Sequence, residues 1–481
     1  MDKLNVCLIN DSFPPEIDGV ANAVTNYARI INSAHGAATV VTPSNPEADD
    51  GAFSFPVVRY PSIDMTKQVG YRAGLPFSAE TMRRIEGASF DIIHSHCPIT
   101  STMLARVARE EINVPVVFTY HTKFDIDIAN AIRSKLMQEE AKKILVQNIS
   151  ACDEVWTVSR GAGENLRKLG YEGDYIVMPN GVDFPRGRVS DALIAEVTQG
   201  VELPEGVPVL LFVGRMMWYK GIRIILDALK QLDEDGVDFR MVFIGGGTDR
   251  DEIVEYAASL DLMNKVYFCQ SIHDRERIRA WYCRADLFLF PSSFDTNGLV
   301  VREAAACALA SVLVAGSCAA EDVTDGVNGF LIEENAASMA AKLRTLFAAP
   351  GIMPRVGEGA QRDIYMSWEE AVGRAYARYF TVIDNYRAGL CPTHEKLTDE
   401  MFKTMAHYLD ASAHAKETRR RRVEELRLGY EAMRTDLTEE HERRLYEMQL
   451  NRRQMKDGFD DSRAKLHEKL EELSERVERF L

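Results

Sequence analysis

Short, almost wholly apolar runs alternate with longer amphipathic segments over the first 390 residues. In the first half, such runs predict strands at residues 4–10, 39–42, 91–94, 114–120, 154–158 and 175–178. The rhythm restarts in the second half, with predicted strands at residues 208–213, 239–244, 265–269, 286–290, 311–314 and 329–332. Strands that are apolar on both faces and separated by helices are typical of parallel sheets covered on both sides. The pattern predicts an α/β protein with two doubly wound, Rossmann-like domains.

The last part of the chain, residues 391–481, has a different pattern. It holds 19 Lys and Arg and 21 Asp and Glu, so 40 of its 91 residues are charged. Apolar side chains recur there at intervals of three and four; they are Val423, Leu426, Tyr430, Met433, Leu437, Met455, Phe459, Leu466, Leu470, Leu473 and Val477. This seam predicts a long helical extension resembling a coiled coil. Three roles stay open for it: dimerisation or recruitment of a partner, packing on its own chain, and binding of anionic lipid through the arginines at 419–422.

The predicted boundaries follow from these changes. Residues 1–197 form an N-terminal domain, and residues 198–366 form a C-terminal domain that begins with a linker rich in Gly and Pro. A final helix at about 367–388, which starts near Trp368, crosses back to the first domain, and residues 391–481 are the charged helical tail.

Charge and apolar content exclude several classes of protein. With 57 Lys and Arg against 73 Asp and Glu, the net charge is −16, which disfavours nucleic-acid binding through a basic surface. No apolar run approaches the ~18 residues of a membrane span, and the start of the chain has no signal-peptide pattern. The eight cysteines show no CxxC or zinc-site spacing. We expect a cytoplasmic protein, and peripheral binding at the inner face of a membrane stays open.

Two loops that follow predicted strands suit phosphate groups. Gly19 opens a helix after the first strand, and a glycine there lets a phosphate approach the helix N-terminus. Arg215 and Lys220 lie five residues apart, between a strand and a helix, where two cations suit a diphosphate. A plain strand–helix turn and a pair of surface cations are the alternative interpretations.

The loop after residues 286–290 carries two carboxylates eight residues apart, Asp295 and Glu303. Backbone amides around Asn297, Gly298 and Leu299 begin a helix between them and would direct its dipole at an anion. Alternatively, Asp295 is only a helix cap and Glu303 a solvated helical acid.

A histidine, His121, ends the predicted strand at residues 114–120, and the segment His94-Ser95-His96 ends the strand before it. A lone histidine is more often structural, but His121 falls at the edge of the sheet where α/β proteins bind ligands.

Together these segments resemble the retaining glycosyltransferases of family 4, which have the GT-B fold: two Rossmann-like domains that face a cleft. The resemblance covers roughly residues 3–388. It rests on PPEIDGV, DIIHSH, TYHT, PNGVD, VGRMMWYKG, IGGG, ADLFLFPSS and the D-x7-E segment that begins at Asp295.

The resemblance implies roles for the candidates on the donor side. Arg215 and Lys220 would hold the donor diphosphate and neutralise the leaving group. Gly19 and the amides of residues 297–299 would contact the same phosphates. Backbone groups of Ser271 and Ile272 would contact the base.

It also implies roles around the sugar. Asp295 would contact hydroxyls of the donor sugar, Glu303 would bind the nucleotide ribose, and His121 would lie beside the transferred sugar. The catalytic candidates are therefore His121, Asp295, Arg215 and Lys220.

The sequence departs from the family pattern at several positions. Asp295 is one methylene shorter than the usual Glu, and Asn297 replaces a Phe. Ala308 and Ala310 stand where Gly and Pro are common, and Gln270 replaces a Gly near the base site.

The resemblance implies a hexosyltransferase that needs no metal and no cofactor, with a nucleotide sugar as co-substrate. The D-x-D tripeptide at residues 125–127 follows TYHTKF rather than a donor loop, so we expect no metal site there. FPPEIDGV and TYHTKFD look most like the branch that glucosylates diacylglycerol, which makes UDP-glucose the leading donor and a membrane glycerolipid the leading cell-envelope acceptor. A polysaccharide or small-molecule acceptor, and a degenerate transferase that serves as a scaffold for the tail, are the alternatives.

Overall fold

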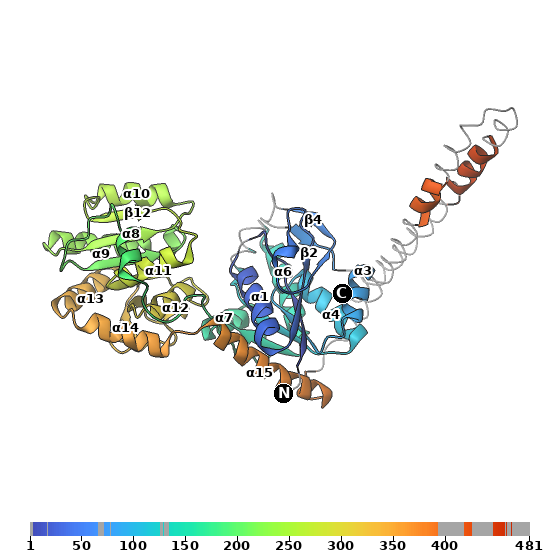
Figure 1. The fold of residues 1–481 in the computed structure, drawn as a ribbon, viewed down its shortest axis with the longest axis horizontal. Helices are drawn as coiled ribbons and strands as arrows, with labels where there is room; N and C mark the ends of the chain where they lie inside the picture. Colours follow the sequence, from blue (N-terminus) through green and yellow to red (C-terminus); the bar gives the residue numbers. More distant parts are fainter. Residues whose placement is uncertain are drawn as a thin grey trace. The chain divides into compact units, whose positions relative to one another are not determined.

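The structure of the chain is a computed structural model that describes residues 3–16, 18–65, 72–76, 78–125, 128, 134–392, 418–425, 446–456, 458 and 463. By its internal contacts the chain divides into two units, Met1–Ala406 and His407–Leu481. The first unit contains two parallel sheets with helices around each (Figure 1).

The first sheet has seven parallel strands in the order β3-β2-β1-β6-β7-β8-β9. Its strands are β1 (Asn5–Ile9), β2 (Ala37–Pro43), β3 (Val57–Tyr60), β6 (Ile92–Ser95), β7 (Val116–Tyr120), β8 (Glu154–Thr157) and β9 (Ile176–Val177). The helices between them are α1 (Gly19–Ile30), α3 (Ala79–Gly87), α4 (Thr100–Ile112), α6 (Lys135–Ser150) and α7 (Arg160–Lys168). Because β1 pairs with both β2 and β6, the strand order reverses beside β1.

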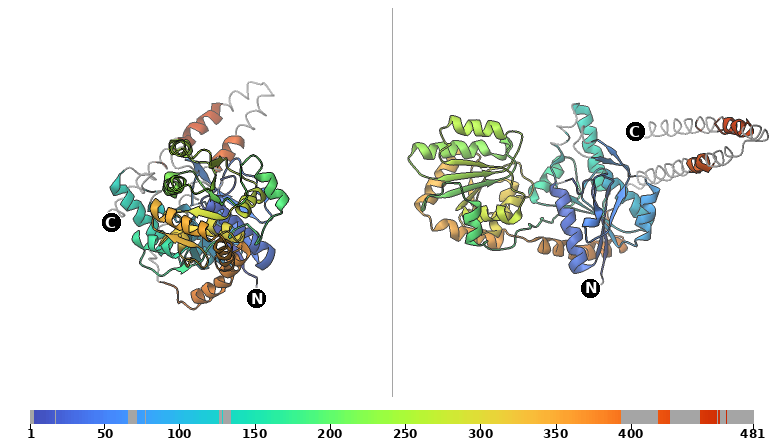
Figure 2. Two further views of the ribbon diagram at one scale, coloured as in Figure 1. Left: turned by 90° about the vertical axis from the view of Figure 1, so that its left-hand side faces the viewer. Right: turned by 45° about the horizontal axis from the view of Figure 1, so that its top comes forward.

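The second sheet has six parallel strands in the order β12-β11-β10-β13-β14-β15, with the reversal beside β10. Its strands are β10 (Val209–Val213), β11 (Arg240–Ile244), β12 (Val266–Cys269), β13 (Leu287–Phe290), β14 (Ser311–Val314) and β15 (Phe330–Ile332). Its helices are α8 (Asp191–Val197), α9 (Ile222–Glu234), α10 (Arg250–Ser259), α11 (Arg275–Arg284), α12 (Leu299–Ala306), α13 (Ala336–Ala348) and α14 (Ile352–Asp363). In the right-hand view of Figure 2, helices lie on both sides of its strands.

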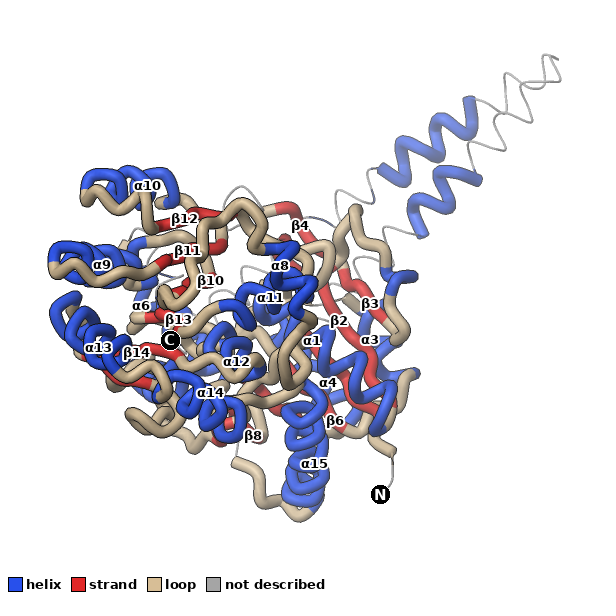
Figure 3. Tube along the Cα trace, turned by 60° about the vertical axis from the view of Figure 1, so that its left-hand side comes forward, coloured by secondary structure: helices blue, strands red, loops and turns tan. Residues whose placement is uncertain are grey.

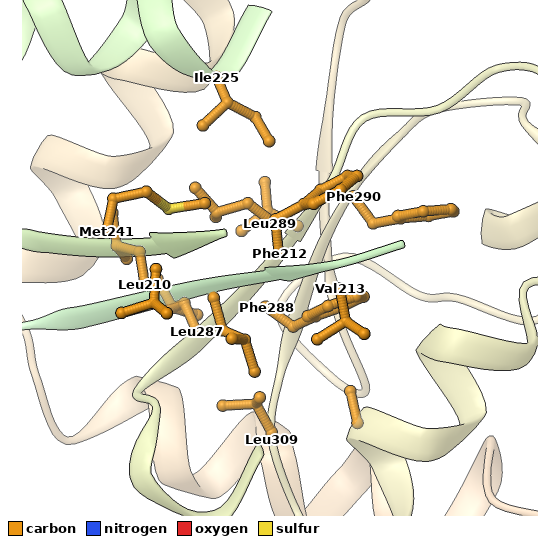
Figure 4. Packing of buried hydrophobic residues seen from close by; sticks show 14 of the residues in the cluster. Leu210, Phe212, Val213, Ile225, Met241, Leu287, Phe288, Leu289, Phe290 and Leu309 are labelled. Carbon is orange, nitrogen blue, oxygen red and sulfur yellow. The ribbon is translucent and has the colours of Figure 1, made fainter. Parts of the chain in front are cut away.

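The central strands of this second sheet are buried on both faces, as their apolar sequences require. Leu210 and Phe212 of β10 and Leu287 and Leu289 of β13 are fully buried. Figure 4 shows how these side chains interdigitate with those of neighbouring elements. Burial of this kind contributes about 25 cal/mol for each Å² of apolar surface, so the strands that carry the site loops are firmly held.

The last helix of the first unit, α15 (Trp368–Arg387), packs in the core of the first sheet rather than the second. Tyr376 on this helix accepts a hydrogen bond through its hydroxyl from the backbone N–H of Leu4, at 2.7 Å. Trp368 packs edge-on against Tyr27 of α1, and Figures 1 and 3 both show α15 beside α1. The chain therefore passes between the two sheets twice, and the two passes are joined where the backbone N–H of Val182 donates to the carbonyl of Met366 at 3.0 Å.

The predicted fold class is confirmed, and all twelve predicted strands are present. Three described strands were not predicted: β3 at the edge of the first sheet, and the antiparallel pair β4 (Ser62–Asp64) and β5 (Arg72–Gly74). These strands are short and only partly buried, and they carry charged residues, so the apolar signal that marks the central strands is weak in them.

In the second unit, residues 418–425 and 446–456 are helical. Val423 and Met455, two residues of the apolar seam, are about half exposed. The other seam residues lie outside the described part of the chain, so the coiled coil stays a prediction. None of the helices in the described ranges is long and apolar enough to cross a membrane.

Candidate active site

Loops at the carboxyl ends of β1, β6, β7, β10 and β13 surround one cavity of about 690 Å³. Four of these strands flank the points where the order of each sheet reverses, and open α/β sheets bind ligands at such points. Seven of the predicted site residues line this cavity, namely Gly19, His121, Arg215, Lys220, Asp295, Asn297 and Leu299. The structure therefore brings groups from both sheets to one site.

Gly19 is the first residue of α1, at the wall of the cavity. Asp18 caps this helix, since its Oδ1 accepts hydrogen bonds from the backbone N–H groups of Val20 and Ala21, both at 2.7 Å. A Cβ atom on Gly19 would meet no described atom within 4 Å. The chain leaves space beside this helix N-terminus, where the positive end of the helix dipole favours an anion.

Arg215 and Lys220 lie in the loop between β10 and α9. The Arg215 side chain is exposed and makes no hydrogen bond or ion pair with another described residue. Lys220 is mostly buried, and its Nζ lies 3.1 Å from Asp295 Oδ2. The loop thus offers one uncompensated cation and one cation that is already paired.

Gly245 and Gly247, which follow β11, support this cationic loop. A Cβ on Gly245 would come within 2.0 Å of the Gly214 carbonyl oxygen, and one on Gly247 within 2.4 Å of the Met216 carbonyl oxygen. Met216 also donates its backbone N–H to the Gly246 carbonyl at 2.8 Å. The glycine-rich segment is therefore explained by close packing on the loop that carries Arg215.

Asp295 closes the turn that leads into α12. Its Oδ1 accepts hydrogen bonds from the backbone N–H groups of Asn297, at 3.2 Å, and Gly298, at 2.9 Å. Burial alone would raise the pKa of Asp295, but the Lys220 charge and these N–H groups outweigh it and hold the pKa below its ordinary value. Two of the amides expected to face an anion are thus engaged by the chain's own carboxylate. Asp295 has the geometry of a cap as well as a place in the cavity.

Glu303, Ser271 and Ile272 are not among the residues that line the cavity, and Gly298 lines a second one of about 400 Å³. Glu303 is buried, with Oε1 at 2.6 Å from Arg275 Nη2 and Oε2 at 3.0 Å from the Tyr282 hydroxyl. Each carboxylate oxygen keeps a further lone pair, so these contacts leave acceptor capacity.

His121 belongs to a connected group of three buried histidines. Its Nε2 lies 2.9 Å from Nδ1 of His96, whose ring packs against that of His94 with centroids 3.9 Å apart and planes tilted by 35°. His94 in turn contacts the Tyr379 hydroxyl of α15 at 2.6 Å. Burial lowers the pKa of His121 to about 3 and the pKa values of His94 and His96 well below their usual range. The site therefore presents a neutral imidazole at neutral pH.

Among the lining residues of the cavity that lie outside the predicted set are Asp11, His96 and Asn180. Asp11 is buried, and its Oδ1 accepts hydrogen bonds from the backbone N–H of Ser101, at 2.8 Å, and from the Ser101 hydroxyl, at 2.5 Å. Burial raises its pKa. Asp11 could have been predicted from the sequence, because it comes directly after β1, and that position lies at the edge of the sheet where α/β proteins bind ligands.

One departure from the family pattern, Ala308, is explained by its backbone conformation. Ala308 adopts a left-handed backbone conformation with φ +54°, which explains why glycine is common there. Within the D-x-D tripeptide, Asp127 lies outside the described residues.

The acidic side chains of Asp11, Glu16 and Asp18 also line the cavity, Asp18 caps α1, and Asp295 pairs with Lys220. The positive groups around it are the N-terminus of α1, the Arg215 guanidinium and the Lys220 ammonium. Such fixed positive groups stabilise negative charge that develops on a leaving group. The neutral imidazole of His121 and the carboxylate of Asp295 add hydrogen-bonding groups suited to hydroxyls.

Comparisons with known proteins found two matching family models and several relatives. Residues 17–186 match the model described as Glycosyltransferase Family 4, and residues 195–363 match the one described as Glycosyl transferases group 1. The chain is similar to a D-inositol 3-phosphate glycosyltransferase of Xylanimonas cellulosilytica, with 30% identity over 294 residues, which cover 59% of this chain and 70% of the relative. An alpha-monoglucosyldiacylglycerol synthase of Streptococcus pneumoniae is 22% identical over 311 residues, 63% of this chain and 69% of its own length.

The fold is also similar to that of Anabaena Alr3699/HepE, solved in complex with UDP-glucose. The TM-score is 0.57 at 18% identity, over 80% of this chain and 99% of that one.

Proposed function

The chain belongs to glycosyltransferase family 4, with the GT-B fold, and on that basis we propose that it transfers a hexose from a nucleotide-diphosphate sugar to a cell-envelope acceptor with retention of configuration. We propose UDP-glucose as the donor and a glycerolipid as the acceptor.

The main observation that supports binding of a sugar nucleotide is that Gly19, Arg215 and Lys220 line one cavity. A diphosphate is the part of a sugar nucleotide that needs several positive groups. Arg215 has no competing ion pair among the described residues, and the space beside Gly19 is unfilled by the chain. These groups would hold the diphosphate between the two domains.

The chemistry proposed here follows from charge. The bond between the sugar and the diphosphate oxygen breaks, and the acceptor oxygen bonds to the sugar from the same face. The acceptor proton passes to a diphosphate oxygen. Arg215 and Lys220 stabilise the leaving diphosphate, a role that needs no metal ion. His121 would contact the sugar as a neutral hydrogen-bonding group rather than as a cation.

A glycerolipid acceptor is supported by the surface of α6. Leu136, Met137 and Ile144 are 75%, 62% and 51% exposed on this helix. Lys135 and Lys143 lie among them. Lys143 pairs with Glu140 at 2.7 Å, so it is the exposed apolar side chains of this helix that suit a membrane interface. The similarity to an alpha-monoglucosyldiacylglycerol synthase points to the same class of acceptor.

A small phosphorylated acceptor is the second candidate. It is favoured by the similarity to D-inositol 3-phosphate glycosyltransferases, which reaches 30% identity. The scaffold alternative is motivated by Asp295, whose carboxylate is engaged by its own turn and by Lys220.

The test supplies the full chain with radiolabelled UDP-glucose and one of two acceptors: vesicles of diacylglycerol and phosphatidylglycerol, or inositol phosphate. We expect label in the lipid fraction, and loss of transfer in Lys220→Ala. Label on inositol phosphate alone would establish the second candidate. If the chain shows no transfer, no hydrolysis of the donor and no binding of UDP, the result would support the scaffold alternative.

The contribution of α6 is tested separately. The double variant Leu136→Ser and Met137→Ser should bind vesicles more weakly while UDP affinity is unchanged. Met263→Ser is the matched control, because Met263 is also exposed but lies in the domain of the second sheet.

A further inference from the structure

Asn297 carries a side-chain amide that is buried without a hydrogen-bond partner. The residue is 9% exposed, and neither Oδ1 nor Nδ2 has a partner among the described groups. Native proteins satisfy the large majority of buried polar atoms, so an amide with both ends unpaired requires an explanation.

The backbone around Asn297 is fixed by neighbouring contacts. Its own N–H donates to Asp295 Oδ1 at 3.2 Å, and the preceding carbonyl, of Thr296, accepts a hydrogen bond from the Ser159 hydroxyl at 2.6 Å. Ser159 belongs to the domain of the first sheet. The backbone of the turn is therefore held by contacts from both domains.

Asn297 also lines both the 690 Å³ cavity and the 400 Å³ cavity. It forms part of the wall that they share, two residues after Asp295. Both amide atoms are covered, so a group bound beside Asp295 in the larger cavity reaches them when the side chain turns into the cavity.

A packing role does not account for an asparagine at this position. An unpaired buried amide destabilises the folded state, whereas an apolar side chain of similar size would not. The amide is consistent with a ligand that supplies the missing hydrogen bonds.

We propose that the Asn297 side chain binds a hydroxyl group of the transferred sugar and helps to select the donor. An amide offers a donor and an acceptor, and a hydroxyl is the group that matches both. Phosphate oxygens at neutral pH would leave Oδ1 without a donor. The inference rests on the proposed transferase function and deepens it.

The test compares Asn297→Leu and Asn297→Ala with the matched control Asn328→Leu. Asn328 is a buried asparagine of the same domain whose amide is satisfied: Oδ1 accepts from the Thr324 N–H at 2.7 Å, and Nδ2 donates to the Asp322 carbonyl at 3.1 Å. Thermal unfolding, affinity for UDP, affinity for UDP-glucose and hydrolysis of UDP-glucose are measured for each variant in the full chain.

We expect Asn297→Leu to keep or raise the unfolding midpoint, whereas Asn328→Leu lowers it. In both Asn297 variants, UDP affinity should stay within about twofold of the wild-type value. UDP-glucose binds the wild-type chain more tightly than UDP, and this gain in affinity should fall by about tenfold, as expected for the loss of one hydrogen bond in a desolvated site. Discrimination between UDP-glucose and UDP-galactose or UDP-xylose should fall with it.

Retention of UDP-glucose affinity, hydrolysis and discrimination in both Asn297 variants would overturn the inference while leaving the proposed function intact. A wild-type chain that binds no sugar nucleotide would overturn both.

Discussion

Lys220 Nζ lies 3.1 Å from Asp295 Oδ2, which joins the cationic loop after β10 to the acidic turn before α12. The resemblance to family 4 assigns these two groups to neighbouring parts of one donor, the diphosphate and the sugar. An anion that binds Lys220 therefore competes with Asp295, whose carboxylate oxygens are also the atoms that the resemblance assigns to sugar hydroxyls.

Asp295→Ala should lower turnover by roughly 10²-fold, because it removes a group expected at the reacting sugar. UDP affinity should be unchanged or higher, because the variant frees Lys220 and the amides of Asn297 and Gly298. Calorimetric titration with UDP and steady-state hydrolysis of UDP-glucose measure the two effects. Parallel losses of UDP affinity and turnover would contradict this division of roles.

Arg215→Ala should weaken binding of UDP-glucose by about tenfold, through the loss of a charge-assisted contact. Because the side chain is exposed and unpaired among the described residues, the free energy of unfolding should change by no more than about 0.5 kcal/mol. The control is Arg223→Ala, an exposed arginine that stacks on Trp218. Equal donor affinity in the two variants would argue against a diphosphate contact for Arg215.

Gly19→Ala should weaken donor binding by about tenfold, because the new methyl group fills space that a phosphate needs. The folded chain accommodates this methyl, so stability should be unchanged or slightly higher. Gly373→Ala, in the middle of α15, adds a methyl at ordinary contact distance from His35 and should leave donor binding unaffected. Chemical unfolding and UDP-glucose titration provide both readings.

Stability should decline as pH falls below about 6.5. The buried His94, His96 and His121 resist protonation, and the pKa of His121 is lowered to about 3, whereas each titrates near 6.5 in an unfolded chain. Between these values the unfolded state binds more protons, so each histidine removes up to ~1.4 kcal/mol of stability per pH unit. Urea unfolding at pH 7.5, 6.5 and 5.5 measures the slope. His96→Gln should show a shallower decline, and an identical slope would mean that His96 is protonated in the fold.

Ala308→Gly should stabilise the chain by about 1 kcal/mol, because Ala308 adopts a left-handed conformation that disfavours a Cβ atom. Ala310→Gly is the matched control: Ala310 is buried and has no positive φ, so glycine there should destabilise. Thermal unfolding of both variants tests whether the two changes in stability have opposite signs.

The central strands were predictable because their residues are apolar on both faces, as in residues 209–213 and 287–290. The meeting of His96 and His121 also follows from topology, since β6 and β7 are parallel neighbours and both residues come directly after their strands. The pairing of Lys220 with Asp295 does not follow, because side-chain direction across 75 residues leaves no periodic trace. Nor does the unpaired amide of Asn297, which depends on how the turn is packed.

The placement of α15 has a consequence for synthesis of the protein. The first sheet begins at Asn5, but Tyr376 and Trp368, which complete its core, are added only after the whole second domain. Translation proceeds at about 5–20 residues per second, so the N-terminal domain waits on the order of ten seconds or more with apolar surface uncovered. We expect that domain to finish folding after its neighbour, and to be the part most dependent on chaperones in a nascent chain.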